Sequence, residues 1–122
     1  MSAADAGAAA AGWVADAART AIAHEPVAEA QRVAGTPSTG WAVLGSAASG
    51  DEVGVWEMTP GAMSDTEADE VFVVLAGRAT VEFVDEGRTL ELAPGAVVRL
   101  VAGARTVWTV HETLRKVYLT PA

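Results

Sequence analysis

The sequence predicts one all-β domain that closes into a sandwich or barrel, and three observations support this prediction. The chain has 122 residues, which is enough for one hydrophobic core and too few for two. Beyond residue 26, short apolar runs alternate with turns rich in glycine and proline. No long helical pattern separates these runs, so we expect the strands to pair antiparallel. The chain therefore divides into residues 1–26, outside the barrel, and residues 27–122, which form it.

The N-terminal part is expected to contain a tail and a short helix. Residues 1–12 are almost all alanine, glycine and serine, a composition that buries too little apolar surface to fold. Good helix formers continue over residues 13–24, and Trp13 begins an apolar stripe at helical spacing. Pro26 would end such a helix. The pattern predicts a short docked helix anchored by Trp13.

Nine short segments are predicted as strands, because each is apolar and ends at a turn signal. They are residues 29–34, 40–47, 52–59, 71–76, 78–84, 89–92, 96–101, 106–111 and 114–119. Asp85-Glu86-Gly87 is a tight hairpin signal between two of these strands. Residues 62–69 are predicted as a loop between strands, so we expect their acidic side chains in solvent.

The charge balance argues against anionic partners. Sixteen acidic against eight basic residues give a net charge of −8, which repels phosphate backbones and anionic lipid head groups. The absence of cysteine excludes disulfides, thiolate zinc sites and thiol catalysis. No stretch of about 18 apolar residues could span a bilayer, and no basic residue precedes the alanine-rich start as a signal peptide would require. We expect a cytoplasmic protein with no nucleic-acid or membrane partner.

Four segments carry a family resemblance. They are VWEMTPG at 55–61, EVFVVLAGRATVEF at 70–83, APGAVVRLVAGARTVWTV at 93–110 and ETLRKVYL at 112–119. Together they resemble the small single-domain cupins related to ureidoglycine aminohydrolase and to the ethanolamine-utilisation cupin, over roughly residues 27–121. The resemblance implies a cupin-type double-stranded β-helix, which is a jelly-roll barrel.

The resemblance also implies where a metal would bind. Cupins place two histidines and a glutamate of a first motif, and one histidine of a second, around a divalent ion. Counted from Glu70, the histidine positions hold other residues, which are Met63 and Asp65, or Ser64 and Thr66, and then Thr106. In the ureidoglycine enzymes the manganese ligands are glutamate, two histidines and glutamine, and the corresponding positions are Ser64, Thr66, Glu70 and Thr106. Only Glu70 is a credible ligand, so we expect no tightly bound metal or other cofactor, with a divalent metal as the alternative.

An oxygen-rich site for magnesium or calcium is the other metal hypothesis. Its ligands would come from Asp65, Glu67, Asp69 and Glu70. Their spacing matches no calcium loop. We therefore interpret the acids as solvated loop residues.

The inside of the barrel is expected to be apolar with one acid. If Glu70 points inward, strand alternation turns Phe72 and Val74 inward as well. The predicted ligand-binding residues are Trp56, Met58, Glu70, Phe72, Thr106 and Trp108. Glu70 is also the candidate catalytic residue, as a desolvated acid or base. Its alternative role is a structural ion pair with Arg99 or Arg105.

The remaining aromatic and histidine residues receive structural interpretations. Trp13 and Trp41 are predicted to pack, whereas Tyr118 could line the cavity. His24 lies at a predicted helix end, and His111 has the opposite strand parity from the inward residues. Both histidines are therefore predicted at the surface.

Three functions are consistent with this pattern. The first is a cupin that binds a small polar or weakly basic metabolite in the barrel without a metal. The second is an enzyme, dependent on a metal or on Glu70, that acts on a small nitrogen-containing compound such as a ureido metabolite. The third is a structural module, and a homodimer is expected because cupins of this size often pair.

Overall fold

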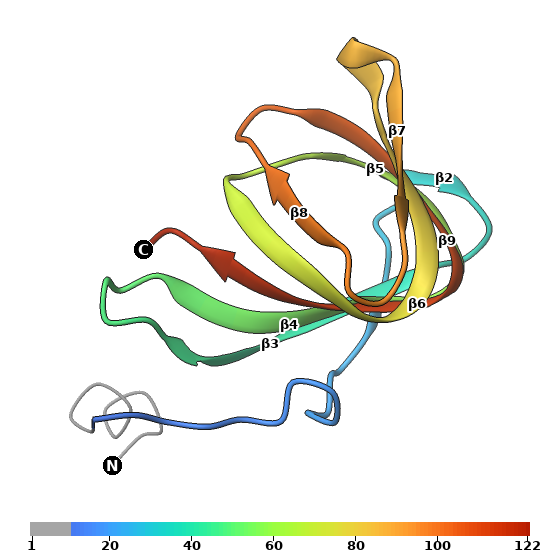
Figure 1. Ribbon diagram of the computed structural model, residues 1–122. Coiled ribbons are helices and arrows are strands. Elements are labelled where there is room, and N and C mark those ends of the chain that lie inside the picture. Colours follow the sequence, from blue (N-terminus) through green and yellow to red (C-terminus); the bar gives the residue numbers. More distant parts are fainter. Residues whose placement is uncertain (1–10) are drawn as a thin grey trace.

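The computed structural model describes residues 11–122 and confirms the all-β prediction. The strands form one strongly curled sheet that folds over on itself (Figure 1). In chain order they are β1 (Glu25–Pro26), β2 (Arg32–Ala34), β3 (Ser38–Ser46), β4 (Glu52–Met58), β5 (Gly61–Thr66), β6 (Glu70–Phe83), β7 (Arg88–Leu92), β8 (Val97–Leu100) and β9 (Arg105–Thr120), with the single-turn 3-10 helix η1 (Val84–Glu86) before β7. The predicted tail lies outside the described residues up to residue 10.

The two longest strands, β6 and β9, organise the barrel. They pair antiparallel from Val71 opposite Leu119 to Phe83 opposite Thr106. The first half of β9 also pairs with β5, and its second half pairs with β4. Strand β3 extends the sheet beyond β4, β2 pairs with β5, and β7 and β8 pair with β6. Both long strands therefore contribute to the two facing walls of the curled sheet (Figure 1).

Each long strand was predicted as two shorter ones, and Gly77 explains the difference in β6. The β6–β9 register shifts at several points between Val74 and Ala79, where the strands bend. Gly77 has a φ of +90°, and a Cβ at this position would lie 2.0 Å from the Thr113 carbonyl oxygen. Only glycine fits this bend. Gly77 therefore bends the strand without ending it.

The predicted loop over residues 62–69 is wrong over most of its length. Strand β5 occupies this region and pairs residue by residue with the first half of β9. Because alternate side chains of a strand face opposite sides, Met63 and Asp65 share the inner face with their partners Trp108 and Thr106. Ser64 faces the other way, and both its backbone N–H and its hydroxyl donate to the Gln31 carbonyl oxygen.

The helix predicted over residues 13–24 does not form. The segment is largely without regular structure and makes one turn, in which the backbone N–H groups of Arg19 and Thr20 donate to the Asp16 carbonyl oxygen. The Trp13 indole packs over Gly45 and donates to the Ser46 carbonyl oxygen at 2.9 Å. Contacts with the sheet replace the intrahelical hydrogen bonds here, so tertiary structure overrides helix propensity. Between residues 11 and 122, no helix is long and apolar enough to cross a membrane.

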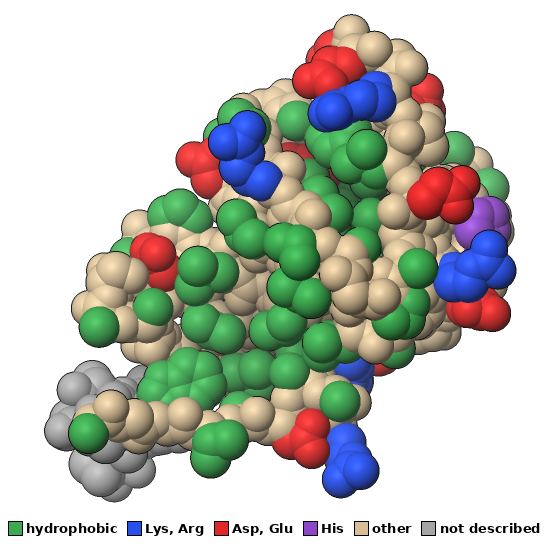
Figure 2. Space-filling model, in the orientation of Figure 1, with side chains coloured by type: hydrophobic (Ala, Val, Ile, Leu, Met, Phe, Trp, Pro, Cys, Tyr) green, Lys and Arg blue, Asp and Glu red, His purple; other side chains and the backbone are tan. Residues whose placement is uncertain are grey.

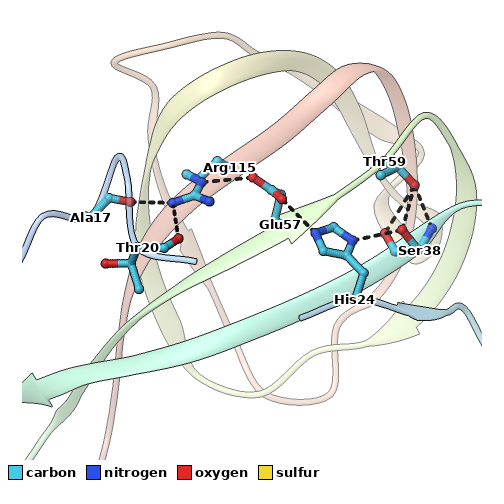
Figure 3. A network of polar contacts seen from close by, with 7 residues as sticks. All are labelled: Ala17, Thr20, His24, Ser38, Glu57, Thr59 and Arg115. Atoms are coloured by element: carbon cyan, nitrogen blue, oxygen red, sulfur yellow. Dashed lines mark hydrogen bonds and ion pairs between the residues drawn. The ribbon is translucent and has the colours of Figure 1, made fainter. Parts of the chain in front are cut away.

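Arg115 holds this N-terminal segment against the outer face of the sheet. Its Nη1 atom donates to the carbonyl oxygens of Ala17 and Thr20 at 2.9 and 3.0 Å (Figure 3). Its Nε atom donates to Glu57 at 2.9 Å, and the other Glu57 oxygen lies 2.7 Å from His24 Nε2. Two distant parts of the chain are thus joined by one polar network.

The two histidines differ in their surroundings. His111 is exposed, as predicted. His24 is partly buried, and its Nδ1 atom lies 2.8 Å from the Ser38 hydroxyl, which in turn contacts Thr59 (Figure 3). The surface prediction for His24 is therefore wrong, because the extended segment brings this residue back onto β3 and β4.

The core lies between the two walls of the sheet, and hydrophobic side chains also cover part of the outside. Phe72 and Val74 are buried on the inner face, as the alternation predicted. Trp41, predicted to pack, is 67% exposed and lines a cleft of about 390 Å³ with Met63 and Gln31. Figure 2 shows hydrophobic side chains gathered across one face of the molecule.

Candidate functional site

The ammonium of Lys116 is the central charged group inside the barrel. Lys116 belongs to β9 and is only 4% exposed. Its Nζ atom lies 4.8, 4.3 and 4.9 Å from the ring centroids of Trp56, Phe72 and Trp108. A ring face attracts a cation at up to about 6 Å. The three rings, from β4, β6 and β9, therefore form an aromatic cage around this ammonium.

Strand register and ring packing hold the cage together. Trp56 lies directly opposite Lys116 in the β4–β9 pair, so the two side chains share one face. The Trp108 ring packs against Trp56 at 5.6 Å and against Phe72 at 5.7 Å between centroids, both in tilted arrangements. Such tilted geometries are favourable between aromatic rings. The cage is thus built from inward positions of three neighbouring strands.

Glu70 is the charged partner of Lys116. Its Oε2 atom lies 2.5 Å from Lys116 Nζ. A buried ammonium requires such a partner, because burial without one costs several kcal/mol. Neither arginine considered from the sequence makes this pair: Arg105 binds Asp85, and Arg99 is exposed.

Lys116 was missed in the sequence, although a signal was present. It follows Trp108 by eight residues in one strand and shares the parity of Leu114 and Tyr118, which are buried. A lysine at an inward position of an apolar alternation indicates a buried charge. What the sequence could not indicate was its carboxylate partner.

Glu67 also reaches the inside of the barrel, contrary to the prediction that it is solvated. Its Oε2 atom accepts a hydrogen bond from the Thr106 hydroxyl at 2.6 Å. The same atom accepts one from the Trp108 indole N–H at 2.9 Å. Glu67 therefore fixes the Trp108 ring, and Thr106 takes part in the site as a hydrogen-bond donor.

Two further titratable groups show the effect of this acidic surrounding. Burial raises the pKa of Asp65, and the charge of Glu67 raises it further. Burial also raises the pKa of Tyr118, as does the hydrogen bond that its hydroxyl donates to Glu52 at 2.9 Å. Burial is thus the main cause of both shifts, and neighbouring carboxylates add to it.

A cleft of about 430 Å³ borders Glu70 at the start of β6. Its charged lining residues are Asp51, Asp69, Glu70 and Arg99, and its apolar ones are Val71, Leu100, Val101, Leu119 and Pro121. The Glu70 side chain remains 17% exposed. A volume of this size suits a small molecule. Because Glu70 lines the cleft and is partly exposed, it is accessible from there while it binds Lys116 inside.

The structure brings most of the predicted ligand-binding residues together around Lys116. Trp56, Phe72 and Trp108 form the cage, Glu70 supplies its carboxylate, and Thr106 joins through Glu67. Met58 stands apart, because it is fully buried in the hydrophobic core opposite Leu114.

The residues at the cupin ligand positions do not fit a divalent metal. Ser64 faces away from the barrel interior, and Thr66 is exposed. Met63 packs in the core, and the Thr106 hydroxyl donates a hydrogen bond to Glu67. Asp65 is the one of these positions with a carboxylate on the inner face. Within residues 11–122, no three histidine, aspartate or glutamate side chains are grouped as a metal site. The Glu70 carboxylate, which would be a ligand, instead binds an ammonium.

Comparison with known proteins identifies related folds. Residues 45–118, more than half of the chain, match the family described as the EutQ-like cupin domain. No curated protein matches the chain. The solved structure of a DUF861-family protein of unknown function from Pseudomonas syringae pv. tomato is 24% identical, with a TM-score of 0.69 over 82% of this chain and 44% of that one. This chain thus spans less than half the length of that protein.

Two other solved structures share the fold. The EutQ protein of Clostridium difficile is 21% identical, with a TM-score of 0.60 over 78% of this chain and 79% of that one. Ectoine synthase from P. lautus is 16% identical, with a TM-score of 0.60 over 69% of this chain and 65% of that one. Because the family match extends from the end of β3 to near the end of β9, the chain belongs to the EutQ-like cupin family.

Proposed function

We propose that this cupin binds a small polar metabolite beside Glu70 and does so without a metal. The observation that supports this most is that Glu70 borders the 430 Å³ cleft on one side and holds the caged Lys116 on the other. A ligand in the cleft can reach a carboxylate whose position is already fixed. A fixed anchor lowers the entropic cost of binding.

The charges around the cleft indicate the class of ligand. The lining of the cleft contains three carboxylates and one cation, Arg99; the carboxylates are Asp51, Asp69 and Glu70. Carboxylates accept hydrogen bonds and do not donate them, so the complementary ligand brings N–H donors or a positive charge. We therefore propose a small amine, amino alcohol or amide, a class that includes ureido compounds and ethanolamine.

Titration with matched small molecules tests this function. Ethanolamine and methylurea supply N–H donors, and acetate of similar size supplies an anion. We expect calorimetry and tryptophan emission to show saturable binding of at least one N–H donor and none of acetate. Glu70→Gln should weaken binding about tenfold, the loss of one charge-assisted hydrogen bond.

The matched control is Glu91→Gln, which removes an exposed carboxylate on β7. This variant should bind like the wild type. Unchanged affinity in Glu70→Gln would show that Glu70 is not the anchor. Stoichiometric manganese, zinc or iron in protein purified without chelators would contradict the metal-free barrel.

We further propose that two copies of the chain pair through the outer face of β6, β8 and β9. Exposed apolar side chains on this face support the proposal; they are Val71, Val97, Val101 and Leu119, with exposures of 38–68%. Val71, Val101 and Leu119 also line the 430 Å³ cleft, so the cleft would lie at the interface of such a pair. Exposed apolar patches are typical of protein interfaces. Light scattering should give a dimer for the wild type and a monomer for Val97→Lys, whereas Val84→Lys, at another exposed valine, should stay dimeric.

A further inference from the structure

We infer that Trp56, Phe72, Trp108 and Glu70 form a binding site for an organic ammonium, which the chain fills with its own Lys116. The site combines three ring faces with one carboxylate. Recognition of alkylammonium groups by proteins uses the same two elements, since ring faces attract a diffuse cation and a carboxylate fixes its N–H groups. Lys116 thus acts as a ligand that is covalently attached to its own receptor.

The geometry supports a cation site and not simple core packing. The Nζ atom lies within 4.9 Å of all three ring centroids and 2.5 Å from the Glu70 carboxylate. A lysine that only filled space would extend its apolar stem along the core and turn its ammonium to water. Here the residue is 4% exposed, and its charged end lies inside the cage.

The cage is also consistent with the residues at the cupin ligand positions, which do not suit a metal. Glu70 is the one position that keeps the carboxylate expected of a metal ligand, and it is bound by Lys116. Because an ammonium already neutralises this carboxylate, the barrel contains a cation without any metal. The ring faces favour an organic cation over a hydrated divalent ion, which requires oxygen or nitrogen ligands.

Chemical rescue tests the inference. Lys116→Ala removes the ammonium and leaves the rings and Glu70 in place. Added n-propylammonium should then raise the thermal midpoint of the variant saturably, by about 5 °C more than that of the wild type, because the wild type can bind this amine only in the cleft. The isosteric neutral alcohol, n-propanol, and Mn²⁺ should produce no such rise. The double variant Lys116→Ala/Glu70→Gln should lose the response to n-propylammonium.

Each other outcome overturns the inference. Equal stabilisation by n-propanol would show an apolar cavity, and stabilisation by Mn²⁺ alone would show a metal site. If Lys116→Ala does not fold, NMR of the lysine NH₃⁺ groups in the wild type decides the question. A caged ammonium should give a signal protected from water exchange and shifted by the rings, and the absence of that signal contradicts the cage. The inference deepens the proposed function, on whose metal-free barrel it rests. The two fail separately, because rescue is the difference in response between Lys116→Ala and the wild type, whereas binding in the cleft is measured on the wild type alone.

Discussion

Arg115 and Lys116 are neighbours in the sequence and carry the same charge, yet they serve opposite faces of β9. Lys116 points inward, to three aromatic rings and Glu70. Arg115 points outward, to Glu57 and to two backbone carbonyl oxygens of the N-terminal segment (Figure 3). Lys116 therefore belongs to the candidate functional site, whereas Arg115 binds the N-terminal segment to the sheet.

The chemistry of the two side chains matches these roles. The guanidinium of Arg115 presents several donors in a rigid plane, so it can bind a carboxylate and two carbonyl groups at once. The ammonium of Lys116 is a compact charge that fits between ring faces. If the two residues were exchanged, the lysine could not bind all three acceptors on the outer face, and the arginine would not fit between the rings on the inner face.

The largest effect is expected from Lys116→Ala. This change leaves Glu70 without its cation and opens a cavity among the rings, so the free energy of unfolding should fall by about 3 kcal/mol. Urea denaturation measures the loss. Arg105→Ala, which breaks the exposed pair with Asp85, should leave the midpoint nearly unchanged. Similar midpoints for both variants would mean that the inner pair contributes no more than a surface pair.

A smaller and more local effect is expected from Arg115→Ala. The substitution removes the donors to Ala17 and Thr20, so the N-terminal segment should detach while the barrel persists. We expect a stability loss of about 1–2 kcal/mol, together with rapid proteolysis and amide exchange before residue 25. The comparison between the two faces fails if Lys116→Ala releases the segment equally.

The smallest effects concern pH, and the two faces should respond with opposite signs. Burial would raise the pKa of Glu57, but the hydrogen bonds and charges of Arg115 and His24 outweigh it and lower this pKa. Glu57 therefore stabilises the fold above its unfolded pKa of about 4.3. This contribution is lost as the pH falls through the lower folded pKa, and Glu57→Gln should remove it.

Burial and then the charge of Glu67 raise the pKa of Asp65, so its charged form destabilises the fold. The penalty is fully present above the folded pKa and disappears below the unfolded pKa of about 3.9. Asp65→Asn should therefore raise the thermal midpoint near neutral pH and have no effect in acid. Thermal scans of Glu57→Gln and Asp65→Asn from acid to neutral pH measure how each substitution changes the thermal midpoint. If both variants changed the midpoint in the same direction at neutral pH, the predicted opposite signs would be wrong.

Particular residues show how far sequence reasoning reached into the site. Alternation correctly turned Phe72, Thr106 and Trp108 inward, because the side-chain period of a strand is a local property. The same rule, applied further along β9, would have found Lys116. It could not have found Glu67, because this residue lies between strands and its side chain turns inward only through its bonds to Thr106 and Trp108.

The sequence by itself determined the all-β class, the cupin family and the lack of histidine at the cupin ligand positions. These properties depend on residue types and short spacings. Only the tertiary structure decided that residues 13–24 are not helical, that β5 replaces a loop and that Lys116 meets Glu70. Those two residues are 46 positions apart, and their contact depends on how β6 and β9 align. Register between distant strands is set by the packing of the whole barrel, and no local pattern records it.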